Sequence, residues 1–233
     1  MQQFQCFILA AGYNSRVDGP CSLWSFSNGK SILDWQIHTF EQAIPESPVC
    51  IAVGYDYEKI VSTFTNLNFT HVLGWETGNA LQTFLQLKHH PESTIIAMYG
   101  DTVFYPETLK TFSQVEADVV VAIDSCWAQR FHGRSQEDIS IAERLNFHHY
   151  GEVEYTGLIK FSPRVIEWVL EHQEKDYSGK TFIDLINVIE QAGFQISAYD
   201  VAGLWAEMNE KNDLVHFILG NKAETLRRVR PQL

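Results

Sequence analysis

Short apolar runs alternate along the first half of the chain with stretches in which apolar residues recur every three to four positions. The runs are rich in Val, Ile and Phe, which is typical of strands covered on both faces. The strand-like runs are 4–10, 49–54, 70–74, 93–100 and 117–124, and the helix-like stretches are 31–43, 56–64, 79–90 and 106–114. Strands and helices that alternate with short connections predict right-handed βαβ units and a mostly parallel sheet.

The pattern changes after residue 124. Residues 125–151 are polar and irregular, so we expect them to form a loop over the sheet. The remaining pattern predicts strands at 152–162, 194–201 and 203–209, helices at 163–173 and 182–193, and a helical C-terminus. Repeats, low-complexity tracts and a linker are all absent from the sequence, which favours one α/β domain over residues 1–233.

Composition narrows the classes of function. The 233 residues are 45% hydrophobic and 13% aromatic, enough for a sizeable core, and the net charge of −12 argues against a general nucleic-acid binder. The four cysteines form no CxxC pair and no disulfide framework, which favours a reducing compartment. Because neither a signal peptide nor a membrane-length apolar run is visible, we expect a soluble cytoplasmic protein with no membrane contact.

A small-residue turn follows the first predicted strand. Leu9, Ala10, Ala11 and Gly12 end that strand, and Arg16 comes shortly afterwards. In open parallel sheets ligands bind outside the carboxyl ends of the strands. Small residues let the backbone approach a phosphate, and arginine can bind one with two hydrogen bonds. A plain tight turn with a surface arginine explains the same residues equally well.

A second motif follows the predicted strand 93–100. Asp101 comes directly after this buried run, next to Gly100. A carboxylate at the carboxyl end of a strand suits Mg²⁺, which binds one or two carboxylates together with substrate phosphates. An aspartate that only caps a turn is the alternative.

Together these motifs resemble the sugar-phosphate nucleotidyltransferases. LAAGYNSR at 9–16 is similar to the LAAGxGxR signature of that family, and IIAMYGDTVF at 95–104 is similar to its strand that ends in Gly-Asp. Four further stretches match in family order: GKSILDWQI (29–37), TGNALQTF (77–84), GEVEYTGLIKFS (151–162) and GLWAEMNEKNDL (203–214). The short length and a tryptophan-bearing loop before AERL (142–145) look most like the small cytidylyltransferases that act on phosphocholine or aminoethylphosphonate.

The resemblance implies a Rossmann-like three-layer sandwich with a mostly parallel mixed sheet. It divides the domain into a nucleotide-binding half, 1–124, and an acceptor-side half, 125–233. The implied reaction is Mg²⁺-dependent: a phosphate or phosphonate attacks the α-phosphorus of a nucleoside triphosphate, CTP being slightly preferred, and pyrophosphate leaves. The implied partners are these two small molecules, and a homodimer is left open.

The resemblance also assigns roles to individual residues. Arg16 would hold the β- and γ-phosphates, and Asp101 and position 209 would bind Mg²⁺. The residues that would surround the nucleotide are Leu9, Ala10, Ala11, Gly12, Gly78 and Asn79.

Two positions depart from the family pattern. Where the family has a phosphate-binding lysine the sequence has Cys21, and where it has a second metal-binding aspartate the sequence has Asn209. A thiol is mostly neutral at pH 7 and cannot replace a fixed cation, and an amide should hold Mg²⁺ more weakly than a carboxylate. The alternative to an active enzyme is therefore a catalytically weakened, nucleotide-binding regulatory or scaffold protein.

Other side chains could compensate for these losses or bind the acceptor. Lys30 and Lys160 are candidate phosphate ligands, and Lys160 is also a candidate catalytic residue because strand alternation places it on one face with Glu154. Solvation before a helix is the alternative for Lys30. Glu207, Trp127, Glu154 and Lys160 are the candidate substrate contacts. Five aromatic residues near predicted site edges could hold a quaternary ammonium group, although core packing is the stronger interpretation: Trp75, Trp127, Phe131, Tyr155 and Trp205.

Overall fold

A mixed sheet forms the centre of the computed structural model, which describes residues 3–15, 18–25, 29–130, 143–147, 149–172 and 177–208. Its strand order is β3-β2-β1-β4-β8-β6-β9, and β7 pairs with β8 beside this path. The strands are β1 (Phe4–Ala10), β2 (Val49–Val53), β3 (Asn68–His71), β4 (Thr94–Tyr99), β6 (Val119–Asp124), β7 (Arg144–Phe147), β8 (Gly151–Phe161) and β9 (Ile196–Asp200).

Strand direction confirms the predicted mixed, mostly parallel sheet. β1 runs parallel to β2 and β4, β2 to β3, and β6 to β9. Among the described strands of this sheet, β8 alone runs the other way, antiparallel to β4, β6 and β7. Because three residues separate β7 from β8, the chain must reverse there, and such a short connection fits an antiparallel pair.

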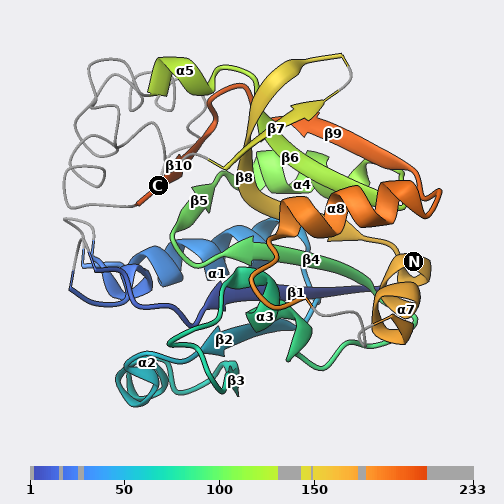
Figure 1. Cartoon of the computed structure of the whole chain (residues 1–233). Helices are drawn as coiled ribbons and strands as arrows, with labels where there is room; N and C mark the ends of the chain where they lie inside the picture. Colours follow the sequence, from blue (N-terminus) through green and yellow to red (C-terminus); the bar gives the residue numbers. More distant parts are fainter. Residues whose placement is uncertain are drawn as a thin grey trace.

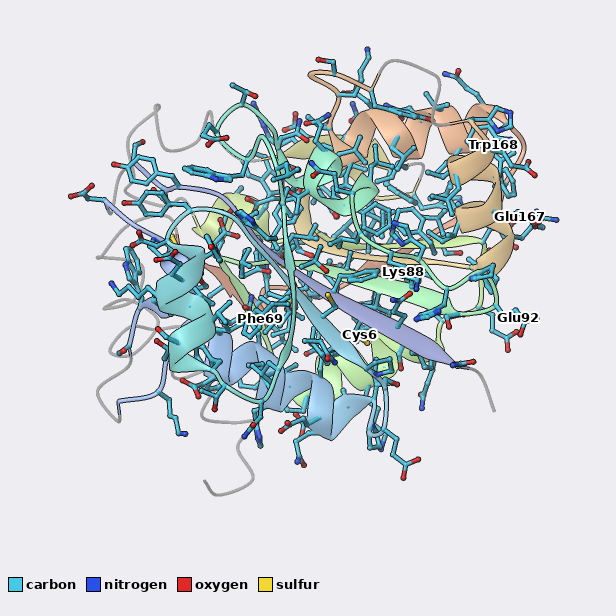
Figure 2. The ribbon with its side chains drawn as sticks, turned by 90° about the horizontal axis from the view of Figure 1, so that it is seen from below. Cys6, Phe69, Lys88, Glu92, Glu167 and Trp168 are labelled. Atoms are coloured by element: carbon cyan, nitrogen blue, oxygen red, sulfur yellow. The ribbon has the colours of Figure 1, made fainter. Side chains whose placement is uncertain are left out.

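Helices cover both faces of the sheet and complete a three-layer arrangement (Figure 1). Alternate residues of β1 point to opposite faces, so Ile8 packs with Phe40 and Phe112 while Phe7 packs with Phe84 and Phe182. One face carries α1 (Ile32–Ala43), α2 (Tyr57–Thr63) and α4 (Pro106–Gln114), and the other carries α3 (Ala80–Leu85), α7 (Pro163–Glu171) and α8 (Phe182–Gln191). Cys6 lies inside the body of the molecule in Figure 2, whereas Glu167 and Trp168 lie at its edge on α7.

Local sequence explains where several helices begin. Ser31 precedes α1, accepts a hydrogen bond from the Asp34 backbone and donates one back to the Asp34 carboxylate. Such a reciprocal capping box satisfies backbone donors that the first helical turn leaves unpaired. Thr181 with Asp184 repeats the arrangement at α8, and α4 and α7 begin with proline, whose fixed φ suits the first helical position.

The structure differs from the prediction in several segments, and β3 (Asn68–His71) lies earlier than the predicted strand 70–74. The expected loop 125–151 contains the short helix α5 (Trp127–Arg130) and β7. β5 (Thr102–Phe104) was not predicted, and it forms a separate antiparallel pair with β10 (Trp205–Glu207). α3 ends at Leu85, well short of residue 90, because the Gln5 side chain donates to the Lys88 carbonyl and accepts from the His90 N–H.

Candidate functional site

A cleft of about 400 Å³ lies at the carboxyl ends of β1 and β4. This volume is in the range that suits a small-molecule ligand. Its wall consists of residues 9–15, 20–22 and 78–80 together with Trp75, Thr83, Tyr99, Gly100 and Asp101. The structure therefore brings together Leu9, Ala10, Ala11, Gly12, Gly78, Asn79 and Asp101, which come from three separate parts of the sequence.

Close packing of Gly100 against β1 places Asp101 in the cleft. The Gly100 N–H donates to the Leu9 carbonyl at 3.0 Å. A Cβ atom at this position would lie only 2.7 Å from the Cα of Ala10, so no larger residue fits without moving the backbone. The glycine of the Gly-Asp motif is thus explained by contact between the two strand ends, independently of any ligand.

Asn79 has a structural role in the cleft wall. Its side-chain oxygen accepts from the N–H groups of Leu81 and Gln82, at 3.0 and 3.2 Å, and so caps α3. Its side-chain nitrogen donates to the Lys180 carbonyl at 2.7 Å. Because the side chain holds α3 and the segment before α8, the surface that residues 78–80 offer to a ligand is largely backbone.

The loop after β1 carries the thiol that replaces the expected lysine. Asn14 and Gly19 pair their backbones across this loop, and Pro20 leads into a short 3₁₀ turn, η1 (Cys21–Leu23). Cys21 is buried, lines the cleft and accepts a hydrogen bond from the Asn14 side chain at 3.2 Å. The residue is thereby built into the loop and places no formal positive charge there.

Ser22 adds a polar group to this wall. The residue is only 3% exposed, it lines the cleft, and its hydroxyl has no hydrogen-bond partner among the residues that the structure describes. Buried hydroxyls without a partner are uncommon because losing contact with water costs free energy. The hydroxyl can donate to a ligand oxygen in the cleft.

Charge in the cleft is sparse. Within the described lining Asp101 is the single charged side chain, and its backbone carbonyl accepts from the Met208 N–H at 2.8 Å. In the described part of the chain no three His, Cys, Asp or Glu side chains form a group that could hold a metal. One carboxylate with phosphate oxygens and water still fits Mg²⁺, which seldom needs an all-protein cage. Arg16, Asn209 and Phe131 lie outside the described residues.

A half-buried glutamate lies behind the cleft wall. The Tyr99 hydroxyl donates to the Glu143 carboxylate, with oxygen–oxygen distances of 3.1 and 3.3 Å. Burial raises the pKa of Glu143 to about 7; the Tyr99 hydrogen bond opposes the rise, and the nearby Glu207 carboxylate adds to it. Sequence reasoning missed Glu143 as a site residue, because a single glutamate in a polar stretch carries no periodic or motif signal.

The shifted pKa of Glu143 predicts a pH-dependent cost to folding. Since the folded-state pKa is about 7 against an ordinary 4.5, the folded protein binds more protons between these values and loses stability as the pH rises through them. We expect Glu143→Gln to raise the free energy of unfolding by about 2 kcal/mol more at pH 8 than at pH 5. Urea denaturation at both pH values measures this, and a change that is equal at the two would contradict the assignment.

Lys160 corrects a prediction from the sequence. The residue is buried, and its ammonium group donates to the carbonyls of Ser113, at 2.9 Å, and Val115 at the C-terminal end of α4. Burial lowers its pKa to about 8. Alternation correctly placed Lys160 on the face of Glu154, but six residues of strand separate them by about 20 Å. Lys160 lies outside the cleft lining, and α4 carbonyls accept from its ammonium group, so the structure gives it no contact with a ligand in the cleft.

The other candidate substrate residues lie outside the cleft lining. Glu154 is buried on β8 opposite Asp124, and the Trp127 ring nitrogen donates to the Glu152 carbonyl at 3.3 Å. Glu207 is half-buried on β10, where strand pairing places it opposite Thr102, the residue that follows Asp101. Lys30 is exposed and pairs with Asp34 at 3.8 Å, as expected for a solvated lysine before a helix.

Comparison with known proteins identifies the fold. No protein-family model matches the sequence, and no curated protein matches it. Among solved structures, the inositol-1-phosphate CTP transferase from T. maritima superposes with a TM-score of 0.67 at 18% identity, covering 97% of this chain and 95% of that one. The CTP:phosphocholine cytidylyltransferase from Streptococcus pneumoniae gives 0.62 at 12% identity, covering 92% of this chain and 97% of that one.

A third solved structure agrees with these two. The 4-diphosphocytidyl-2C-methyl-D-erythritol synthase from Anaerococcus prevotii gives a TM-score of 0.65 at 13% identity, and the match covers 97% of each chain. The chain therefore has the α/β fold of NTP- and CTP-dependent nucleotidyltransferases over nearly its whole length. None of its described helices has the length and apolarity needed to cross a membrane.

Proposed function

We propose that the protein is a nucleotidyltransferase that transfers a nucleoside monophosphate, from CTP in preference, to a small phosphorylated or phosphonate metabolite. The observation that carries the proposal is the cleft itself. It brings the turn after β1, the start of α3 and Asp101 into one cavity of about 400 Å³, in a fold shared with CTP-dependent transferases. These three sequence motifs lie far apart in the chain, and all of them line this one ligand-sized cavity.

Each group of residues has a proposed binding role that follows from its chemistry. Residues 9–12 would accept the nucleotide along their backbone, and Gly78 and Asn79 would border the nucleoside. Arg16 would bind the phosphates that leave as pyrophosphate. Asp101, with Asn209, would hold Mg²⁺, which neutralises charge on the phosphates when it is bound. The candidate contacts of the acceptor are Glu207, Glu154 and Trp127.

The reaction requires little covalent chemistry from the protein. An oxygen of the acceptor phosphate or phosphonate forms a bond to the α-phosphorus, and the bond from that phosphorus to the bridging oxygen breaks, so that pyrophosphate leaves with the electron pair. Catalysis of such a transfer rests on in-line positioning and on stabilisation of the developing charge. The short distance between the turn after β1 and the Gly100–Asp101 corner supplies that positioning.

The proposed acceptor is a small phosphomonoester or phosphonate. The structural neighbours act on inositol 1-phosphate and phosphocholine by their names, so one fold accommodates chemically different acceptors. A direct test measures pyrophosphate release from each of the four NTPs with a panel of phosphomonoesters and phosphonates, with and without Mg²⁺. Release that needs both an acceptor and Mg²⁺ supports the proposal. Its absence under every condition would overturn it.

A second candidate function is favoured by Cys21. A buried, hydrogen-bonded thiol occupies the loop position where the resemblance expects a phosphate-binding lysine. Losing one positive group directed at developing charge costs about 10²–10³ in rate. A nucleotide-binding regulatory protein would keep the cleft without the reaction. Thermal stabilisation by nucleotides combined with no pyrophosphate release identifies this second function.

Restoring the cation at position 21 should strengthen triphosphate binding. We expect Cys21→Lys to lower the dissociation constant for CTP about tenfold, because charge-assisted hydrogen bonds stabilise more than neutral ones. Cys21→Met is the matched control, since it lengthens the side chain without adding charge, and it should not tighten binding. Calorimetric titration measures both variants. Equal tightening by methionine, or weaker binding by lysine, would contradict the electrostatic reason.

A further inference from the structure

Three aromatic rings contact one another in a row beside the cleft, and two of them line it; we call this row the aromatic wall. It consists of Tyr13, Tyr55 and Trp75. The centroids of Tyr13 and Tyr55 lie 4.8 Å apart, and those of Tyr55 and Trp75 lie 5.5 Å apart. Tyr13 and Trp75 both line the cleft, and Tyr55 connects them. The rings come from three loops, after β1, β2 and β3, so the wall exists only in the folded chain.

Backbone contacts fix the wall against the turn after β1. The Tyr55 N–H donates to the Ala11 carbonyl at 2.9 Å and so joins the second loop to the first. A Cβ atom at Gly54 would lie 2.5 Å from the Cγ atom of Trp75, which shows that the indole rests directly on this glycine. Trp75 also packs on the sheet core, and the Tyr13 hydroxyl donates to Asp18 at 3.0 Å. A pre-arranged wall loses little entropy when a ligand binds.

The wall offers apolar ring surface where the rest of the described lining is mostly small. Tyr13 is 45% exposed although it sits at the edge of a ligand-sized cleft. Small residues at 9–12 and 78–80 leave room beside the rings for a flat molecule. A nucleobase is flat, and its π-face stacks on aromatic side chains whatever base it is. Asp101, the charged residue of the described lining, lies after β4 and outside the three loops that carry the wall.

We propose that the base of the donor nucleotide stacks on the aromatic wall, with Tyr13 and Trp75 as its binding residues. The inference rests on the proposed function, since the donor nucleotide is the occupant it names. Stacking of this kind contributes to the binding of every base and does not by itself select one of them. The wall therefore adds affinity for a ligand that carries a base, which the phosphate-binding loop does not provide.

Calorimetry with two probes separates stacking from phosphate binding. CTP carries a base, and inorganic triphosphate does not. We expect Tyr13→Leu and Trp75→Leu to weaken CTP binding about tenfold or more, while inorganic triphosphate changes less than about twofold. Tyr13→Phe keeps the ring and should bind CTP as the wild type does. Trp168→Leu is a matched tryptophan control because Trp168 lies on α7 outside the cleft lining (Figure 2).

The outcomes distinguish this inference from the proposed function. Equal weakening of CTP and inorganic triphosphate, or no weakening of either, overturns stacking. Tyr13→Leu keeps the test valid if Trp75→Leu unfolds, because the exposed Tyr13 contributes little to the core. If the wild-type protein binds CTP and the variants show the expected pattern, but no pyrophosphate is released, base stacking is supported and the transferase function is not. Wild-type protein that binds no nucleotide overturns both.

Discussion

Asp101→Asn should lower the rate of pyrophosphate release about 10²–10³-fold while the protein stays folded. Asp101 is the charged residue of the described cleft lining, and Gly100 holds it against the turn after β1. Asparagine has nearly the same shape but lacks the charge that binds Mg²⁺ and helps to position the phosphates. The rate is measured over a range of Mg²⁺ concentrations, because a weakened metal site should recover in part at high concentration.

Glu92→Gln is the control for this variant. Glu92 is an exposed carboxylate that lies outside the cleft lining, and Figure 2 shows it at the edge of the molecule. Removing its charge should leave the rate unchanged, so a loss specific to Asp101 cannot come from net charge alone. A loss of less than about threefold in Asp101→Asn would remove Asp101 from the proposed metal site.

The second large effect concerns stability and comes from Asp124. This carboxylate is 1% exposed and accepts three hydrogen bonds, from the N–H of Cys126 at 2.9 Å, the N–H of Gly203 at 3.1 Å and the Trp205 ring nitrogen at 2.8 Å. Asp124→Ala removes the acceptor of the buried Trp205 ring nitrogen and of two half-buried backbone N–H groups, at about 1–3 kcal/mol for each donor that stays without a partner. We expect the free energy of unfolding to fall by about 4 kcal/mol, measured by urea denaturation.

Asp124→Asn separates shape from hydrogen bonding. It keeps one oxygen but turns an N–H₂ group toward a donor, so its loss should lie between those of wild type and alanine. Asp124→Ala within about 1 kcal/mol of wild type would show that the three donors find other partners. Asp124→Ala should also affect the cleft. Asp124 holds Trp205 at the start of β10, and the Met208 N–H after β10 donates to the Asp101 carbonyl.

The sequence predicted the elements whose signal is local. β1, α1 and α4 begin and end within one residue of the expected positions, because buried runs, caps and a first-turn proline determine them. α3 was predicted too long, since its end depends on Gln5, more than 80 residues away in the chain. β5 has three residues and exists through its pairing with β10, so it has no distinctive local pattern, whereas β10 lies inside the predicted strand 203–209 and is shorter than expected.

The sequence selected some of the residues that line the cleft and missed others. The rule that ligands bind at the carboxyl ends of strands, together with the family resemblance, selected residues 9–12, Gly78, Asn79 and Asp101, all of which line the cleft. Strand alternation selected Lys160, which lies outside the cleft lining. Alternation determines which face of the sheet a side chain is on and says nothing of how far along the strand a ligand lies. The Tyr99–Glu143 contact and the aromatic wall depend on approach between loops distant in sequence.

Phosphorus NMR of the complete reaction tests the central claim of nucleotidyl transfer most directly. CTP and each acceptor of the panel are incubated with the protein and Mg²⁺, and the phosphorus-containing products are identified. We expect a new anhydride that joins CMP to the phosphate or phosphonate of one acceptor, together with one equivalent of pyrophosphate. Formation of CDP and inorganic phosphate, or of CMP and pyrophosphate without any acceptor, would contradict this expectation.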